Sequence, residues 1–285
     1  MNCLEKVDLH ETQNVALDIM KVVDQFCEGH DLRYCLIYGS LIGAVRHAGF
    51  IPWDDDLDIM MPREDYDTFC ALWNAERPCS YLKLFTPDDV CDYPYMIGRV
   101  SDSRYQIEVE NEKPYGMGVF IDIYPYDGLG NSKLGAILRG FAGDLLSSLL
   151  YSATRVECPV PLYATGLKRH LGRSAHRLAK AIGQERLKRW LSSIPVCDYN
   201  SSKYVGCVTW LCGGWSDIFE RSWIEGKARM PFDDCSLRVP SDPHAFLSHI
   251  ACYGDYMQLP PEDQRYGHHD YVTWKKLDSK RCHEV

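Results

Sequence analysis

Residues 38–58 read YGSLIGAVRHAGFIPWDDDLD, and four of the last five residues in this stretch are aspartates. Like charges repel at such short spacing, and short carboxylates compete for the backbone hydrogen bonds of a helix or sheet. The run therefore contributes little to folding and indicates a binding function. A glycine–serine pair, Gly39–Ser40, stands upstream and predicts a tight turn that opens a helix over 40–47.

The spacing of the acids predicts which of them share a face. In an extended segment, residues two apart project to the same side. We therefore expect Asp56 and Asp58 to lie together, with Asp54 joining them if the extended conformation begins early. By the same parity Asp55 is expected to point away and to be structural.

Another acid, Asp122, stands alone in the apolar segment GVFIDIYP at 118–125. A buried aspartate without a partner would cost several kcal/mol of desolvation, so a cation or a hydrogen-bond network is implied. Three carboxylates from two neighbouring strands suit Mg²⁺, which takes oxygen ligands and is usually completed by substrate phosphates. The turn at Gly39–Ser40 would offer backbone N–H groups to such a phosphate.

Two other acidic sites are excluded by spacing. In an EF-hand beginning at Asp54, the glycine position would be Ile59 and the final glutamate position would be Asp65. A glycosidase needs two acids set apart around a sugar, whereas these acids are adjacent.

Composition limits the class of protein. The 285 residues can bury a full core, and 46% hydrophobic with 25% charged residues is ordinary for a soluble enzyme. A formal charge of −9 argues against binding to nucleic acid. The start MNCLEKVDLHETQ lacks the apolar part of a signal peptide, so a cytoplasmic protein with reduced cysteines is expected.

Apolar spacing predicts an α+β protein, a mixed-sheet core with a helical accessory region. The predicted helices cover 11–30, 40–47 and 63–76, and most of 132–195. The predicted strands cover 33–39, 56–61, 81–85, 93–100, 105–110 and 118–125. We expect a catalytic core over 1–130, a helical accessory region over 131–209, and a C-terminal part over 210–285 that completes the active site.

Two parts of the helical region bear on membranes. The apolar run LGAILRGFAGDLLSSLLYSA at 134–153 is interrupted by Arg139 and Asp144, so a membrane span is not expected. Between 163 and 195 stand eight basic residues and one acid. This stretch predicts either contact with an anionic membrane surface or lipid-linked glycan, or a helical hairpin with a solvated face.

The glycine–serine pair, the D-x-D pattern and the late aspartate resemble the nucleotidyltransferase fold typified by DNA polymerase β. More specifically, YGSLIGAVRHAGFIPWDDDLDIMMPREDY at 38–66 is similar to the signature of the LicD family, which includes fukutin and fukutin-related protein. The later blocks GVFIDIYPYDG, YGDYMQLPP and RYGHH also resemble family blocks. The resemblance covers about 5–128 and 215–272. Ser40 replaces the commoner threonine, and Arg99 stands where many members have lysine.

The resemblance implies a transferase that forms a phosphodiester on a hydroxyl of a cell-surface glycan, from a CDP-linked donor. Bacterial members typically move phosphocholine from CDP-choline. The expected acceptor is lipopolysaccharide, teichoic acid or a capsule precursor, or its lipid-linked form, at the inner membrane face. Transfer of another group such as ribitol phosphate, nucleotidyl transfer, and a catalytically idle glycan-binding relative are the alternatives.

The expected site residues follow. Asp56, Asp58 and Asp122 are the expected catalytic residues and, with Asp54, the ligands of two Mg²⁺ or Mn²⁺ ions. Asp122 is expected nearest the attacking hydroxyl. The expected donor-binding residues are Gly39, Ser40, Arg46, His47 and Arg99. Alternatively, Arg46 and Arg99 form ion pairs with the acids, and His47 is a structural hydrogen-bond partner.

Aromatic residues could form a cage for a quaternary ammonium group. The candidates for choline or acceptor contact are Trp53, Tyr253, Tyr256 and Trp274, and the alternative for each is ordinary packing. His268 and His269 are expected to contact substrate or metal, or else to face solvent.

Overall fold

A computed structural model describes residues 4–90, 93–109, 111, 113, 115–159, 166–195, 197–210, 217–267 and 271–277. Its helices are α1 (Leu9–Gly29), α2 (Tyr38–His47), α3 (Arg63–Glu76), α4 (Lys133–Thr154), α5 (Gly166–Ile182), α6 (Gln184–Ser192), α7 (Arg221–Ile224) and α8 (Pro243–His249). Its strands are β1 (Leu4–Lys6), β2 (Cys35–Leu36), β3 (Asp58–Pro62), β4 (Leu82–Phe85), β5 (Gly98–Asp102), β6 (Tyr105–Val109), β7 (Phe120–Gly128), β8 (Tyr204–Gly206), β9 (Phe219–Glu220), β10 (Arg229–Phe232), β11 (Cys235–Arg238) and β12 (Tyr271–Lys276).

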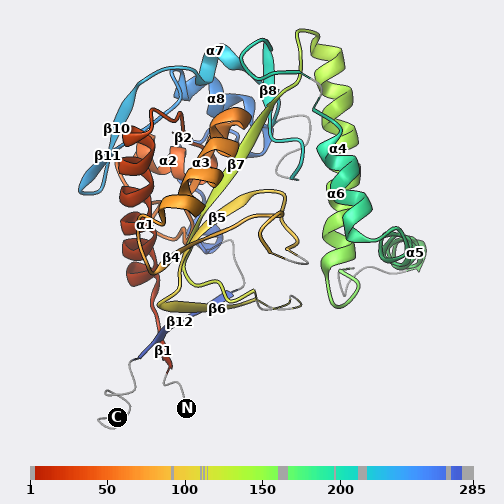
Figure 1. The fold of residues 1–285 in the computed structure, drawn as a ribbon, viewed down its shortest axis with the longest axis horizontal. Coiled ribbons are helices and arrows are strands. Elements are labelled where there is room, and N and C mark those ends of the chain that lie inside the picture. Colours follow the sequence, from red (N-terminus) through yellow and green to blue (C-terminus); the bar gives the residue numbers. More distant parts are fainter. Residues whose placement is uncertain are drawn as a thin grey trace.

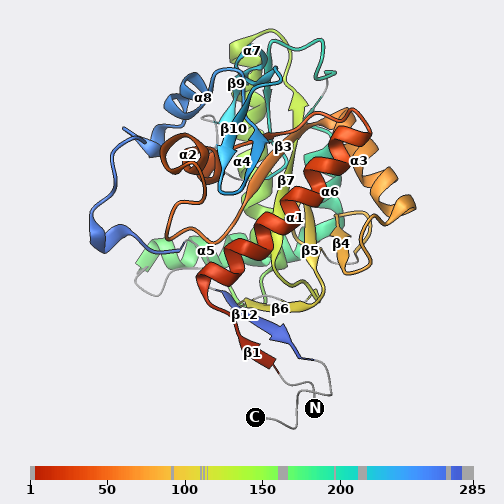
Figure 2. The same cartoon turned by 90° about the vertical axis from the view of Figure 1, so that its left-hand side faces the viewer.

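The main sheet has the strand order β2-β3-β7-β5-β4, with β8 added on β7 and β9 added on β8. Only β3 and β7 run parallel among these pairs, so the described sheet is mixed. Helices α1 and α3 pack on one face of the sheet, and α4 and α6 lie behind it (Figures 1 and 2). The predicted α+β class with a mixed sheet is confirmed.

The centre of the sheet is buried on both faces. Every residue of β3 and β7 is buried, including the aspartates they carry. Such doubly covered strands read as continuous apolar runs because neither face meets water. Each buried isoleucine or leucine in this core stabilises the fold by about 1.5–3 kcal/mol. The strands that carry Asp58 and Asp122 are thereby held rigidly.

Three predicted elements near the acidic stretch have different boundaries in the structure. Helix α2 begins at Tyr38, so Gly39 and Ser40 lie in its first turn and not in a turn before it. The strand predicted over 33–39 is accordingly only Cys35–Leu36. Strand β3 begins at Asp58, two residues later than predicted, which leaves 54–57 irregular.

The predicted helical character of 132–195 is confirmed by α4, α5 and α6, which lie together beside the main sheet (Figure 1). Leu150, Ala153, Ala179, Leu187 and Leu191 form their shared core. Strand β8 returns the chain to β7 within the range predicted as the accessory region. In the described part of the chain, α4 alone is long and apolar enough to cross a membrane, with a mean hydropathy of 1.2.

The C-terminal part contributes strands that the sequence did not predict. Strand β12 pairs with β1 and β6 in a small antiparallel sheet, and β10 pairs with β11 in a hairpin. The first residue of β12, Tyr271, packs against Phe120 at the start of β7, with ring centroids 6.0 Å apart. The C-terminal end of the described chain therefore borders the acidic stretch.

Candidate active site

Three neighbouring strands place two acids and a base in one row. Asp58 on β3 is the register partner of Asp122 on β7, and Asp122 is the partner of Arg99 on β5. Register partners on adjacent strands project to the same face of a sheet. All three side chains are buried, with exposed fractions of 6%, 4% and 7% respectively. A buried charged row of this kind needs compensation, because unpaired charges are costly away from water.

Arg99 compensates Asp122. Its Nε donates to Asp122 Oδ1 at 2.6 Å, and its second guanidinium nitrogen donates to Oδ2 at 3.3 Å. The guanidinium carbon lies 3.8 Å from the ring centre of Tyr95 and 4.2 Å from that of Phe120. Burial by itself lowers the pKa of Arg99, but Asp122 and nearby tyrosines raise that pKa well above its usual value. The ion-pair alternative for Arg99 is therefore observed, and a role in donor binding stays a prediction.

Asp58 is held by its backbone and not by a cation. Its N–H donates to Ser40 Oγ at 2.8 Å. Its Oδ1 is buried and accepts no hydrogen bond from the residues that the structure describes. Burial, and then repulsion from Asp56, Asp122 and Asp54, raise the pKa of Asp58 well above its usual value, while Arg99 opposes this shift. The predicted role of Asp58 as a metal ligand stays a prediction.

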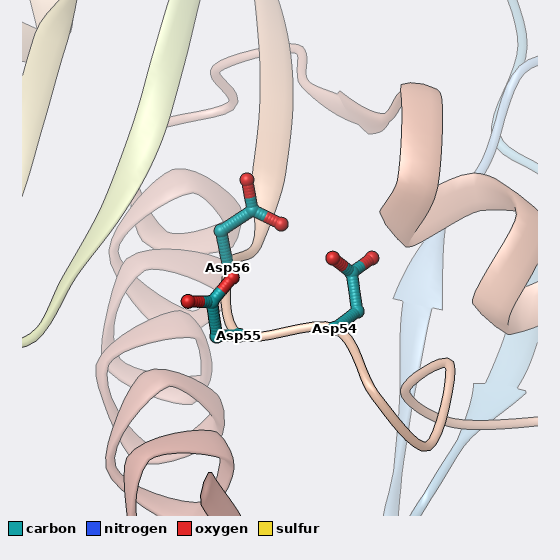
Figure 3. A group of neighbouring side chains, drawn as sticks. All are labelled: Asp54, Asp55 and Asp56. Carbon is teal, nitrogen blue, oxygen red and sulfur yellow. The ribbon is translucent and has the colours of Figure 1, made fainter. Parts of the chain in front are cut away.

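Asp54, Asp55 and Asp56 gather one carboxylate oxygen each within 4.8 Å (Figure 3). The expectation that Asp55 points away from its neighbours is wrong. The alternation of faces applies to extended strands, and the segment before Asp58 is irregular. Asp54 is buried against the first turn of α2, where a Cβ on Gly39 would lie 2.7 Å from Asp54 Oδ2. A carboxylate is favoured there by the positive end of the helix.

These oxygens suit a hard divalent cation. Carboxylates are the usual protein ligands of Mg²⁺ and similar ions. Each carboxylate offers about four acceptor positions, so Asp122 can accept from Arg99 and still ligate a metal. The buried oxygen of Asp58 lacks a hydrogen-bond donor among the described residues, as a ligand atom would. The acidic side chains therefore fit the predicted metal, which would neutralise their mutual repulsion.

Two of the predicted donor-binding residues contact other parts of the chain. Arg46 donates to the carbonyl oxygens of Tyr256 and Gln258 at 2.6 and 3.1 Å, and to His47 Nε2 at 3.0 Å. Among the described residues it pairs with no carboxylate, so the ion-pair alternative for Arg46 is not observed there. Burial and the charge of Arg46 lower the pKa of His47.

The predicted aromatic residues lie on several different elements, and a shared cage stays a prediction. Trp53 lies beside His47 and under Arg265, whose guanidinium carbon is 5.5 Å from the ring centre. Tyr256 is buried and hydrogen-bonds through its hydroxyl to His244. Trp274 lies on β12 opposite Gln106, in the small sheet. Tyr253 is half-buried in a short 3₁₀ helix (Ala251–Tyr253). His268 and His269 lie outside the described residues.

Tyr271 is a neighbour of the acids that the sequence did not indicate. Its hydroxyl donates to the carbonyl oxygen of Asp55 at 3.4 Å. Burial, and then Asp55, Asp56 and Asp122, raise the pKa of Tyr271 well above its usual value. Its position depends on the pairing of β12 with β6, which no local sequence pattern predicts.

A cavity among the described residues lies at the other end of the parallel strands. It has a volume of about 790 Å³ and is lined in part by Arg63, Tyr66 and Asp127. Arg63 and Asp127 satisfy one another there, with hydrogen bonds of 2.7 and 3.1 Å. The row of Asp58 and Asp122 differs, because a buried oxygen of Asp58 accepts no hydrogen bond from the described residues.

The described acids form an oxygen-rich centre, and the binding of metal ions and phosphate there stays a prediction. A protein-family model described as "LicD/FKTN/FKRP, nucleotidyltransferase domain" matches residues 31–131. This range includes Arg99 and the acids Asp54, Asp55, Asp56, Asp58 and Asp122.

Curated proteins extend the match over the whole chain. The "Lipopolysaccharide cholinephosphotransferase LicD" of Haemophilus influenzae is 30% identical over 269 residues, which cover 93% of this chain and 97% of that protein. The chain therefore belongs to the LicD family, as its signature predicted. Uncharacterized proteins of Rickettsia prowazekii and Rickettsia typhi are each 45% identical over 47 residues, or 16% of this chain and 18% and 15% of theirs.

Proposed function

We propose that this chain is a metal-dependent phosphotransferase with a nucleotidyltransferase-like fold. It moves phosphocholine from CDP-choline to a hydroxyl of a cell-surface glycan such as lipopolysaccharide. Membership of the LicD family and the name of the Haemophilus influenzae relative support the group transferred and the acceptor class. The residues of the site support the reaction type.

One observation carries the proposal: Asp58 and Asp122 are paired across parallel strands, and a buried oxygen of Asp58 accepts no hydrogen bond from the described residues. A structural acid would be paired, as Asp127 is with Arg63. A buried acid whose charge is left uncompensated in this way is typical of sites that bind a charged ligand.

The metal would be Mg²⁺ or Mn²⁺, bound as two ions. Its ligands would be Asp54, Asp56, Asp58 and Asp122. When bound, the metal supplies charge neutralisation at the donor diphosphate and activation of the acceptor hydroxyl. Arg99 fixes the orientation of Asp122, which is the residue placed to take the proton of the attacking hydroxyl. Ser40 fixes the backbone of Asp58, so that a shift of α2 would move this ligand.

The donor would approach the start of α2 and the residues that follow it. Gly39 brings the positive end of the helix close to the acids, while Arg46 and His47 stand at the opposite end of α2. The lowered pKa of His47 makes it a neutral hydrogen-bond partner near pH 7, so its role would be to position and not to supply charge. Trp53 and Tyr253 are half-buried and are our candidates for contact with the trimethylammonium group, with His268 and His269 as acceptor contacts.

The reaction would take place in the cytoplasm, at the inner face of the membrane, where lipid-linked glycans are assembled. Transfer of another CDP-activated group, such as ribitol phosphate, keeps every step of this scheme and changes only the donor pocket. Nucleotidyl transfer would attack the other phosphorus. An idle glycan-binding relative would bind acceptor without turnover.

The test is a donor panel. Purified protein with Mg²⁺ is given CDP-choline, CDP-ribitol or CTP, with and without purified lipopolysaccharide, and the nucleotide products are separated. The proposal predicts CMP from CDP-choline in the presence of acceptor. CMP only from CDP-ribitol would support the alternative donor, and pyrophosphate from CTP would support nucleotidyl transfer. Acceptor binding without any product would support the idle relative.

A further inference from the structure

Helix α4 presents its large apolar side chains to the outside. Leu134, Leu138, Phe141 and Leu145 follow one another at spacings of three or four residues, which places them in one stripe along the helix. Their exposed fractions are 67%, 61%, 56% and 63%. We call these four residues the α4 stripe.

Opposite the stripe, the buried face of α4 carries small residues, and Leu150 continues this face toward the C-terminal end of the helix. The small residues are Ala136, Gly140, Gly143 and Ser147. A Cβ on Gly143 would lie 2.3 Å from the carbonyl oxygen of Val208, so the helix is packed too closely there to rotate. An ordinary surface helix turns its large apolar side chains inward. The pattern in α4 is the reverse, and an exposed apolar patch of this kind marks an interaction surface.

Helix α5, which packs on the C-terminal end of α4, is strongly basic. Helix α5 has five cationic residues and no acid, namely Lys168, Arg169, Arg173, Arg177 and Lys180. It is fastened to the C-terminal end of α4: Ser152 and His176 hydrogen-bond at 3.1 Å, and Lys180 Nζ donates to Arg155 O at 2.8 Å. Helix α5 also exposes Leu171 and Leu178, at 60% and 56%. Exposed leucines combined with cations are typical of helices that lie in a membrane interface.

We propose that the α4 stripe and helix α5 form a docking surface for an anionic phospholipid bilayer. Charge complementarity selects this occupant. The chain carries a formal charge of −9 overall, so an anionic membrane would repel it except at this basic region. A second copy of the chain on the same surface would bring two basic helices together, which disfavours self-association.

The helix lies on the bilayer and does not cross it. Ser132 caps its N-terminus, Arg139 donates to the carbonyl oxygen of Leu129, and the small-residue face stays packed on the protein. Only the outward stripe is available to enter the lipid, and it penetrates to the depth of its side chains.

The docking surface is joined to the strand that carries Arg99. Met96 is buried in the same cluster as Leu150, Ala153 and Ala179, and its neighbour Tyr95 stacks on Arg99. In both views α5 stands at the level of β5 (Figures 1 and 2). Docking would therefore bring the acidic centre to a lipid-linked acceptor. This last link rests on the proposed function, whereas the docking itself rests only on the surface.

The test is flotation of the full-length chain with phosphatidylcholine vesicles that contain or lack phosphatidylglycerol. We expect binding only to the anionic vesicles, and weaker binding at high salt. The variant L138Q/F141Q/L145Q should reduce binding on the order of tenfold for each inserted side chain lost. The variant R173E/R177E should abolish the preference for anionic lipid.

The matched control is M257Q/L259Q, which removes two apolar side chains that are 50% and 51% exposed outside the helical part. It should bind like the wild type. All these positions are exposed, and circular dichroism would verify folding of each variant. Absence of flotation of the wild type, unchanged binding of the α4 variant, or a dimer in sedimentation velocity that the α4 variant dissociates would each overturn the proposal. CMP release with a detergent-solubilised acceptor is measured in parallel, so a failure of docking is distinguished from a failure of the reaction.

Discussion

Asp58 and Asp122 face each other as register partners on the parallel strands β3 and β7, and only Asp122 has a cation in hydrogen-bond contact among the described side chains. The difference between the two acids defines what each one does. Asp122 is oriented by Arg99, whereas Asp58 retains a buried oxygen without a hydrogen bond from those residues. The predictions below follow from this asymmetry.

Replacing Asp58 by asparagine should separate stability from activity. In the presence of EDTA, D58N should raise the free energy of unfolding by about 1–3 kcal/mol, because asparagine is neutral and removes the cost of keeping a buried acid protonated beside three other acids. Turnover should fall by about 10³-fold or more, because the charge that holds the metal is lost. Chemical denaturation and CMP release measure the two effects.

D127N is the matched control for this buried acid. Asp127 is 3% exposed but pairs with Arg63 at the far end of β7. Its replacement should lower the free energy of unfolding by about 3–5 kcal/mol, since Arg63 loses its partner. Turnover per folded molecule should be unchanged. If D58N also destabilised the metal-free protein, the acid would be a structural one.

The metal-free protein should lose stability as the pH rises. The folded-state pKa of Asp58 is raised, so the folded state keeps a proton that the unfolded state releases above about pH 4. The contribution of Asp58 to stability is therefore fully present below that pH, and it is lost as the pH rises through the folded pKa. Thermal melts in EDTA should show this loss, which Mg²⁺ and D58N should each reduce. A melt in EDTA independent of pH in the wild type would contradict the prediction.

Ser40 should be replaceable by threonine but not by alanine. Its hydroxyl oxygen accepts the N–H of Asp58 at 2.8 Å in a buried setting. S40A would leave that N–H without an acceptor and should cost about 1–3 kcal/mol. S40T keeps the oxygen and should retain both stability and turnover. Equal behaviour of the two variants in denaturation would show that the hydrogen bond is dispensable.

Replacing Gly39 should displace the Asp54 carboxylate and have little effect on the stability of α2. Alanine at this position would place a Cβ 2.7 Å from Asp54 Oδ2 and displace the carboxylate. We expect the affinity for Mn²⁺, measured by calorimetry, to fall about tenfold, with a change in unfolding free energy below about 1 kcal/mol. G29A is the control, because its Cβ would meet nothing within 4 Å at the end of α1. An unchanged Mn²⁺ affinity in G39A would remove Asp54 from the metal site.

Replacing Arg99 by lysine should impair activity although the charge is kept. Lysine cannot form the two-point contact with Asp122 or stack in the same way between Tyr95 and Phe120. We expect kcat to fall about 10–100-fold with a small change in the KM for CDP-choline. A large rise in KM with unchanged kcat would instead assign Arg99 to donor binding.

Only part of the arrangement of the acidic stretch could be predicted from its sequence. The pairing of Asp58 with the isolated Asp122 was predictable, because an acid in an otherwise apolar strand needs a partner or a ligand that offsets its desolvation. The direction of Asp55 was not, because the alternation rule assumes a strand that in fact begins only at Asp58. The start of α2 was also misplaced, since contacts from Asp54 and Asp58, distant in sequence, fix its first turn.

Contacts between distant parts of the chain explain which neighbours of the site could not be predicted from the sequence. Tyr271 reaches the acids only because β12 pairs with β6, and Arg46 reaches Tyr256 and Gln258 from another part of the chain. The basic character of α5 was evident from composition. The outward stripe of α4 was not, because periodicity alone does not say which face of a helix is buried.

The central claim is tested most directly by mass spectrometry of the acceptor. Lipopolysaccharide that lacks phosphocholine is incubated with CDP-choline, Mg²⁺ and either the wild type or D58N. The account predicts that the wild type adds one phosphocholine mass to the glycan while releasing CMP, and that D58N adds none although it is folded. A glycan unchanged by the folded wild-type protein, or one modified equally by D58N, would contradict it.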